Sequence, residues 1–182
     1  EQSERWRSLV AGLAGAAEGA PLEPVEVPAG LAATLRHYQH SGFEWLTFLR
    51  RSGLGGILAD DMGLGKTMQT LAMILRAVQD RETTQVRQTT HPVGDATDAT
   101  DADSAAREGG ERAAYPPFVV VAPTSVLPTW LAEAARFAPS LRVAALGETT
   151  KRRGGSIAAA VAGADLVVTT YAVFRIDAEA FR

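Results

Sequence analysis

The chain has no cysteine among its 182 residues, and its three histidines are too scattered to suggest a metal site. Disulfides and thiolate-bound metals are therefore excluded, which is compatible with a reducing cytoplasm. No apolar run approaches the ~20 residues of a membrane-spanning helix, so we expect no membrane partner. Because 46% of the residues are apolar, the chain is long enough to form one domain with a sizeable core.

Strong positive charge is also lacking. The formal net charge is −3, which by itself argues against a nucleic-acid partner. Much of the acid lies in residues 80–116, a polar and repetitive stretch with no aromatic residue before Tyr115. Such a stretch buries too little apolar area to offset its ordering entropy, so we predict a disordered acidic insertion. A solvated loop is favoured over an acidic docking tail. The rest of the chain is close to neutral, so a local basic groove that binds nucleic acid is still possible.

The chain begins at Glu1 rather than methionine, so we expect it to be a piece of a longer protein. Residues 1–30 are predicted to form a leader made of one helix and a proline-containing extended linker. Trp6, Leu9, Val10 and Leu13 follow the i, i+3, i+4, i+7 spacing of one helix face. This spacing favours an amphipathic helix over a signal peptide.

Residues 55–67 form the stretch around which the chain is organised. An expected strand, Ile57 to Ala59, is followed by Asp60, Asp61, Met62, Gly63, Leu64 and Gly65, and then by Lys66-Thr67 at the start of a predicted helix. A glycine loop before a helix presents backbone N–H groups to phosphates. Lys66 would reach the β- and γ-phosphates, and the Thr67 hydroxyl would hold Mg²⁺. The usual first glycine is replaced by Asp60, and the alternative is an ordinary glycine turn.

Strand and helix patterns alternate along residues 31–182. Strands are expected at residues 57–59, 118–122, 142–146 and 166–169, and helices at 35–51, 66–79, 156–162 and 171–176. A further helix is expected around Trp130 to Ala138, with Thr129 as its cap and Thr34 as the cap of the helix at 35–51. This alternation predicts an α/β fold, a parallel sheet with helices on both faces.

Small hydroxyl residues follow the expected strands at the edge where ligands bind in such sheets. Thr124, Ser125, Thr169 and Thr170 could contact a nucleic-acid backbone, but from these residues alone ordinary capping and turn formation is the favoured explanation. Gln39 lies on the first helix of this region. Its amide could pair with adenine through one donor and one acceptor, or it could be a solvated helix residue.

Four segments together resemble the SWI/SNF-type branch of the superfamily 2 helicase-like ATPases, in a bacterial style. Residues 35–46 resemble its Q motif, with His37 where proline is common, and residues 58–67 resemble its motif I, including the acid at Asp60. Residues 120–139 and 165–171 resemble motifs Ia and Ib. The resemblance implies the N-terminal part of a first RecA-like lobe that binds ATP and Mg²⁺. It also implies adenine recognition by Gln39 and contacts to double-stranded DNA from Thr124, Ser125, Thr170 and Tyr171.

The chain ends before the positions where that family carries its motif II acids and its second lobe. The resemblance therefore implies a DNA-dependent ATPase and duplex translocase in the full-length protein, which could act on a protein partner, with this piece alone incompetent for turnover. Two alternatives stay open: a strand-separating or RNA-directed helicase, and a catalytically silent nucleotide-binding scaffold.

Overall fold

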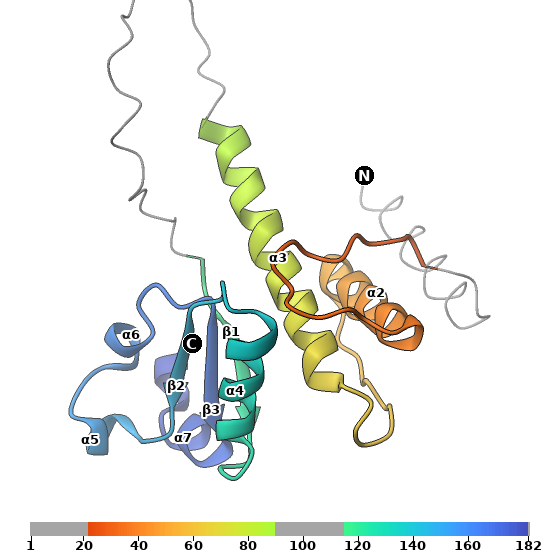
Figure 1. The fold of residues 1–182 in the computed structure, drawn as a ribbon. Coiled ribbons are helices and arrows are strands. Elements are labelled where there is room, and N and C mark those ends of the chain that lie inside the picture. The colour runs from red at the N-terminus through yellow and green to blue at the C-terminus, as the bar shows by residue number, and fades with distance from the viewer. Residues whose placement is uncertain (1–21, 90–114, 182) are drawn as a thin grey trace, which may run out of the picture.

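A computed structural model describes residues 22–89 and 115–181 of the chain (Figure 1). The predicted N-terminal helix and the central part of the predicted acidic insertion lie outside the described residues. In the described part, no helix combines the length and the apolar character needed to cross a membrane.

Three parallel strands form the sheet at the centre of the domain. They are β1 (Phe118–Ala122), β2 (Val143–Leu146) and β3 (Leu166–Thr170), in the order β1-β3-β2. All five residues of β3 are buried because this strand is flanked on both sides. The run of β-branched residues that predicted a doubly covered parallel strand is therefore explained, and the predicted parallel sheet is confirmed.

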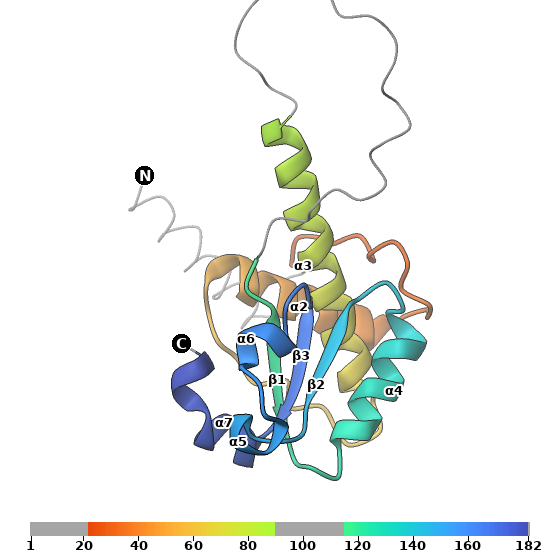
Figure 2. The ribbon, with the colours of Figure 1, turned by 90° about the vertical axis from the view of Figure 1, so that its left-hand side faces the viewer.

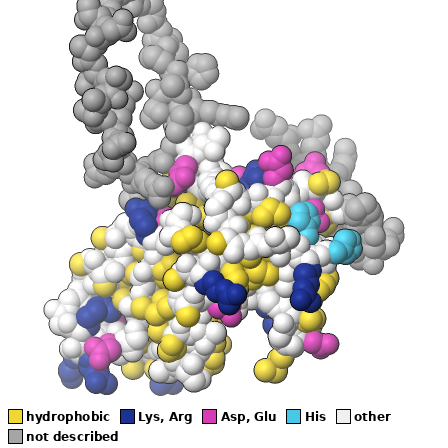
Figure 3. Space-filling model, viewed as in Figure 1, with side chains coloured by type: hydrophobic (Ala, Val, Ile, Leu, Met, Phe, Trp, Pro, Cys, Tyr) yellow, Lys and Arg dark blue, Asp and Glu magenta, His cyan; other side chains and the backbone are white. Residues whose placement is uncertain are grey.

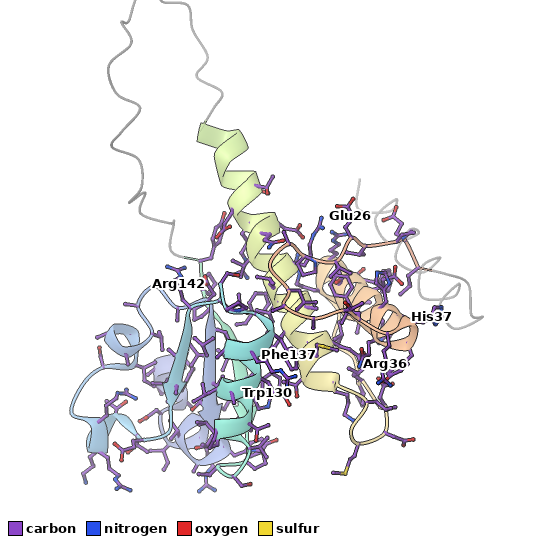
Figure 4. All side chains as sticks on the ribbon, viewed as in Figure 1. Glu26, Arg36, His37, Trp130, Phe137 and Arg142 are labelled. Carbon is purple, nitrogen blue, oxygen red and sulfur yellow. The ribbon has the colours of Figure 1, made fainter. Side chains whose placement is uncertain are left out.

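Helices cover both faces of the sheet (Figures 1 and 2). On one face, Leu166 and Val168 pack with α3 (Lys66–Thr89) and α4 (Leu127–Phe137), and Trp130 and Phe137 of α4 join this core (Figure 4). On the other face, Val167 packs with α6 (Ile157–Ala160) and α7 (Tyr171–Ile176). The alternation of neighbouring β3 side chains between the two clusters follows from the two-residue period of a strand.

The helix α2 (His37–Ser52) lies against α3 on the side away from the sheet (Figure 1). Phe43 is fully buried and packs with Ala72 of α3 and with Val25 of the extended leader. Short elements complete the described chain: α5 (Thr150–Arg153) and the 3₁₀ turn η1 (Ala178–Phe181). The helix α2 therefore forms a further layer outside α3, and the connection between α2 and α3 carries the candidate site.

One carboxylate ties α3 to the last turn of α2, where the connection between the two helices begins. Asp80 of α3 accepts from Arg50 at 3.1 Å and from Arg76 at 2.9 Å, and it lies 3.6 Å from Arg51. Burial lowers the pKa of Arg50, and the attraction of Asp80 opposes this shift. Arginine keeps its charge in proteins, so the partly buried guanidinium depends on Asp80 for compensation.

The predicted strand at Ile57–Ala59 is wrong: residues 54–60 form no strand. A strand persists through hydrogen bonds to a neighbouring strand, and no described strand pairs with this segment. Ile57 is 85% exposed, although its apolar character led us to expect a core position.

Several helix boundaries also differ from those predicted. The helix α2 begins at His37 with Arg36 as its N-cap, not after Thr34, and α4 begins at Leu127 with Pro128 in its first turn, ahead of Thr129. Pro suits a first helical turn because the N–H that it lacks has no partner there. The segment predicted as insertion from residue 80 is helical up to Thr89. It is held through Asp80 and through Arg81, whose guanidinium lies over the rings of Tyr115 and Phe118.

Replacing Asp80 tests the link between α2 and α3. We expect Asp80→Ala to lower the free energy of unfolding by about 1.5 kcal/mol, because it removes charged hydrogen bonds and leaves Arg50 without compensation. Urea denaturation measures the change. The control is Glu148→Ala, which removes an exposed pair with Arg152 at 3.7 Å and should change stability by less than about 0.5 kcal/mol. Equal losses in both variants would contradict the proposed importance of Asp80.

Candidate nucleotide-binding site

The loop that joins α2 to α3 reaches the end of the domain toward which the strands run (Figure 1). The turns after β1 and β3 lie at this same end, because the strands are parallel and Ala122 pairs with Thr170. The helix α3 begins at Lys66, immediately after the loop. The first N–H groups of a helix have no partners within it, so this end of α3 is a natural position for an anion.

Lys66 folds back over the loop. Its ammonium group donates to the carbonyl oxygen of Asp60 at 2.5 Å and to that of Asp61 at 2.8 Å. Both acceptors are neutral groups, and an anion would add direct charge–charge attraction to the hydrogen bonds of this ammonium. The side chain predicted to bind phosphate is thus held within the loop and is available for exchange.

Two glycines give the loop its curvature. Gly63 and Gly65 have φ angles of +86° and +78°, a left-handed conformation that other residues adopt only with strain. A Cβ at Gly63 would meet nothing within 4 Å, whereas a Cβ at Gly65 would lie 2.7 Å from Nε2 of Gln39. The second glycine is therefore required twice, by its backbone angle and by the close approach of Gln39.

Gln39 is 6% exposed, so its interpretation as a solvated helix residue is wrong. Its Oε1 accepts from the N–H of Arg36 at 2.9 Å, and its Nε2 donates to the carbonyl of Leu64 at 3.1 Å. These bonds fix the amide beside the loop and use one lone pair and one hydrogen. An amide offers two of each, so one acceptor site and one donor remain.

Gln69, which lies one turn after Lys66 on α3, was not predicted from the sequence as a site residue. Its Nε2 donates to the carboxylate of Asp60 at 3.2 Å and to the Leu64 carbonyl at 3.4 Å, and the residue is fully buried. This contact explains the acid in place of the usual first glycine, since the Asp60 side chain has a partner within the fold. The sequence signal that could have identified Gln69 was an acid within a phosphate loop, followed by a glutamine in the next helix.

The remaining residues of the predicted ATP site lie at the tip of the loop and in the first turn of α3. Thr67 lies in the first turn of α3 and is partly buried, while Asp61 and Met62 are exposed at the tip. The open space at Gly63 and the free first turn of α3 fit phosphate groups. The single hydroxyl of Thr67 fits Mg²⁺, which usually keeps several waters and takes few ligands from the protein.

The four residues predicted to contact DNA divide into two groups. Thr124 and Ser125 are exposed in the turn after β1, and Tyr171 is 63% exposed at the start of α7. Thr170 is buried, and its hydroxyl accepts from the N–H of Val173 at 3.3 Å. Thr170 therefore caps α7, as the simpler interpretation proposed, while the other three side chains share the open edge.

Comparison with known protein families gives a match to the SNF2-related domain over residues 38–182. The chain is 36% identical over 177 residues to the putative ATP-dependent helicase/translocase YwqA of Bacillus subtilis. It is 34% identical over 161 residues to the TATA-binding protein-associated factor MOT1 of Saccharomyces cerevisiae. These matches cover 97% and 85% of this chain but only 16% and 7% of the two relatives.

Among solved structures, the chain resembles the SWI2/SNF2 ATPase core of Sulfolobus solfataricus in complex with double-stranded DNA. The TM-score is 0.60 at 32% identity, and the match covers 87% of this chain and 25% of the other. A second structure, of the Sulfolobus solfataricus SWI2/SNF2 ATPase core domain, gives a TM-score of 0.59 at 32% identity.

The two loop glycines form a matched pair for testing the packing of Gln39. Alanine at either position meets backbone strain of about 1–2 kcal/mol. We expect Gly65→Ala to destabilise the chain by about 1 kcal/mol more than Gly63→Ala, because it also displaces Gln39 from its hydrogen bond. Chemical denaturation of both variants measures this difference. If the two losses were the same, the contact between Gln39 and Gly65 would contribute nothing to stability.

Proposed function

This chain belongs to the SNF2-related family, and from that premise we propose that it is the ATP-binding part of a DNA-dependent ATPase that translocates on double-stranded DNA. The observation that carries the proposal is the position of Lys66, held by two loop carbonyls at the start of α3. The chain spans 16% of YwqA and 25% of the Sulfolobus core, so activity of the whole protein requires further segments.

ATP binding proceeds by exchange of partners at Lys66. The ammonium group leaves the carbonyls of Asp60 and Asp61 and takes up charge-assisted hydrogen bonds to the β- and γ-phosphates. The N–H groups at Gly65 and in the first turn of α3 orient the phosphates, and the Thr67 hydroxyl contributes one ligand to Mg²⁺. The metal, when bound, neutralises charge that develops on the transferring phosphoryl group.

Adenine is recognised by Gln39 in this proposal. Its amide is already oriented by Arg36 and Leu64, so binding the base costs little additional side-chain ordering. The unused hydrogen on Nε2 would donate to N7 of the base, and the unused lone pair on Oε1 would accept from N6. This arrangement selects adenine over guanine, which has an acceptor at the corresponding position.

Hydrolysis needs groups from outside the chain. An acidic pair that completes the metal site and orients water, and arginines from a second RecA-like lobe, are the missing parts in this proposal. Lys66 stabilises the transferring charge, but it provides no base for the attacking water. Residues 1–182 alone would therefore bind ATP without turning it over at a useful rate.

The exposed hydroxyl residues at the sheet edge bind DNA in this proposal. Thr124, Ser125 and Tyr171 would donate to phosphate oxygens, which positions a duplex without reading its sequence. Lysines and arginines occur in separate groups on the face shown in Figure 3, rather than in one continuous stripe. The structure of the Sulfolobus relative with double-stranded DNA supports a duplex over a single strand.

Two finer assignments complete the proposal. The name of the MOT1 relative associates that protein with the TATA-binding protein, which supports a protein partner for the motor formed with this chain. A cytoplasmic location is the assignment that suits an ATP-dependent activity on DNA, and a chain without cysteine is compatible with that reducing compartment.

The ATP site is tested by Lys66→Ala. The variant loses charge-assisted contacts with the phosphates, and we expect ATP affinity to fall by about 1.5–3 kcal/mol, or roughly 10- to 150-fold. Isothermal titration calorimetry with MgATP measures the change. Lys151→Ala, the same substitution on exposed α5, is the control and should bind ATP normally. Unchanged affinity in Lys66→Ala would refute the assignment of the site.

The DNA contacts are tested by the double substitution Thr124→Ala and Ser125→Ala in the full-length protein. We expect duplex affinity to fall about tenfold as two hydrogen bonds to phosphate are lost. The slope of log affinity against log salt should stay the same, because neutral hydroxyls release no counterions. Thr83→Ala, on exposed helix surface, is the control. A changed salt slope, or unchanged affinity, would contradict these contacts.

A further inference from the structure

Gln69 is a polar side chain in a fully buried setting. It is 0% exposed, and its Nε2 has two acceptors, the Asp60 carboxylate and the Leu64 carbonyl. Because both neighbours at that end are acceptors, the nitrogen must face them and the oxygen must face away. That oxygen has no hydrogen-bond partner among the described residues. A buried amide oxygen without a hydrogen-bond partner lowers the stability of the fold. The two hydrogen bonds that Nε2 donates are therefore expected to serve another function, which offsets this loss.

The unpaired oxygen faces Gly42 of α2. A Cβ added at Gly42 would lie 1.9 Å from Oε1 of Gln69 and 3.0 Å from its Cδ. Only a glycine leaves room for the amide, and its Cα–H is the group that meets the oxygen, as happens where helices approach closely. Gly42 lies three residues after Gln39, so the two residues share one face of α2. That face therefore contacts the loop through Gln39 and accommodates Gln69 through Gly42.

The two acceptors of Gln69 lie on either side of the loop tip. Asp60 precedes the tip, and its carbonyl holds the ammonium of Lys66 at 2.5 Å while its carboxylate accepts from Gln69. Leu64 follows the tip, and its carbonyl accepts from both Gln39 and Gln69. Gln69 thus links the two sides of the loop by hydrogen bonds. It also holds Asp60 in place, the residue whose carbonyl accepts from Lys66.

We propose that Gln69 is a positioning residue for ATP binding, which holds the phosphate loop open at fixed width through Asp60 and Leu64, with Gly42 as the position that makes room for it. The inference rests on the proposed ATP site. The bonds from Lys66 to the carbonyls break when phosphate binds, but nothing in that exchange requires the bonds of Gln69 to break. The loop therefore has its binding conformation before ATP arrives. Binding then involves no loss of conformational entropy from ordering the loop.

The first test is Gln69→Leu, which keeps a similar volume and removes both donor bonds. We expect ATP affinity, measured by calorimetry, to fall about tenfold. The unfolding midpoint should change little, because the unpaired oxygen is removed as well. In the full-length enzyme, KM for ATP should rise while kcat is retained. Gln79→Leu is the matched control: it removes a glutamine-to-carbonyl bond, to Ala29 at 2.6 Å, from the same helix about 15 Å away. It should leave ATP affinity unchanged.

A second variant, Gln69→Glu, separates positioning from packing. The introduced carboxylate has the same shape but, when ionised, repels Asp60 and has no hydrogen to donate. We expect its ATP affinity to fall at least as far as that of Gln69→Leu. A purely steric role would leave ATP affinity unchanged.

The role of Gly42 is tested by a double-mutant cycle. Gly42→Ala should displace Gln69 and lower both stability and ATP affinity. Adding Gln69→Ala relieves the clash, so stability should recover in part while ATP affinity stays low. If Gly42→Ala lowers stability by the same amount whether or not Gln69 is present, the two residues are not coupled and the proposal fails.

Failure of the inference and failure of the ATP site are distinguishable. If Lys66→Ala weakens ATP binding but Gln69→Leu stays within about twofold of the unsubstituted chain, the ATP site stands and the role of Gln69 is refuted. Unchanged ATP affinity in Gln69→Glu would refute that role as well. If Lys66→Ala has no effect on ATP binding, the site itself is refuted, and the inference about Gln69 is refuted with it.

Discussion

The carbonyl oxygen of Leu64 accepts hydrogen bonds from two glutamines on different helices, and the candidate site depends on this meeting point. The loop that surrounds it is rich in glycine and exposed at its tip, so it has almost no packing of its own. Its shape must be imposed by neighbours. Gln39 and Gln69 impose it from α2 and α3, and the close contact of these helices at Gly42 is what allows both amides to reach one oxygen.

The position of Lys66 favours anions over neutral ligands. Its ammonium is already bonded to two carbonyls, so a ligand must replace those bonds with stronger ones. Phosphate oxygens do so because they carry negative charge, which adds an ion-pair attraction to the ammonium that a neutral carbonyl lacks. A nucleoside without phosphates offers no such gain at Lys66. In the proposed ATP site, selectivity for a polyphosphate would therefore arise from this exchange of partners at Lys66.

The sequence predicted those features whose cause is local or periodic. The β-branched run before Ala122 and the residues of β3 indicated buried parallel strands, and Lys66 and Gly65 indicated the loop. Prediction from the sequence failed where a contact between distant parts of the chain determines the structure. Ile57 to Ala59 have the composition of a strand, but pairing depends on a neighbouring strand, which the described residues do not provide. Gln69 was missed for the same reason, since its role depends on the approach of Gly42 and Asp60 in space.

The acid at Asp60 illustrates why motif and fold must be considered together. A carboxylate beside a triphosphate would repel it, and from the pattern alone Asp60 is a missing glycine. In the structure its Oδ2 is bonded to Gln69, which directs the carboxylate toward the buried interface of α2 and α3. The carbonyl of the same residue holds the Lys66 ammonium, so positive charge lies close to the acid. Asp60 and Gln69 therefore form one hydrogen-bonded unit, and in the proposed ATP site this unit would give the loop its rigidity where the usual first glycine is replaced.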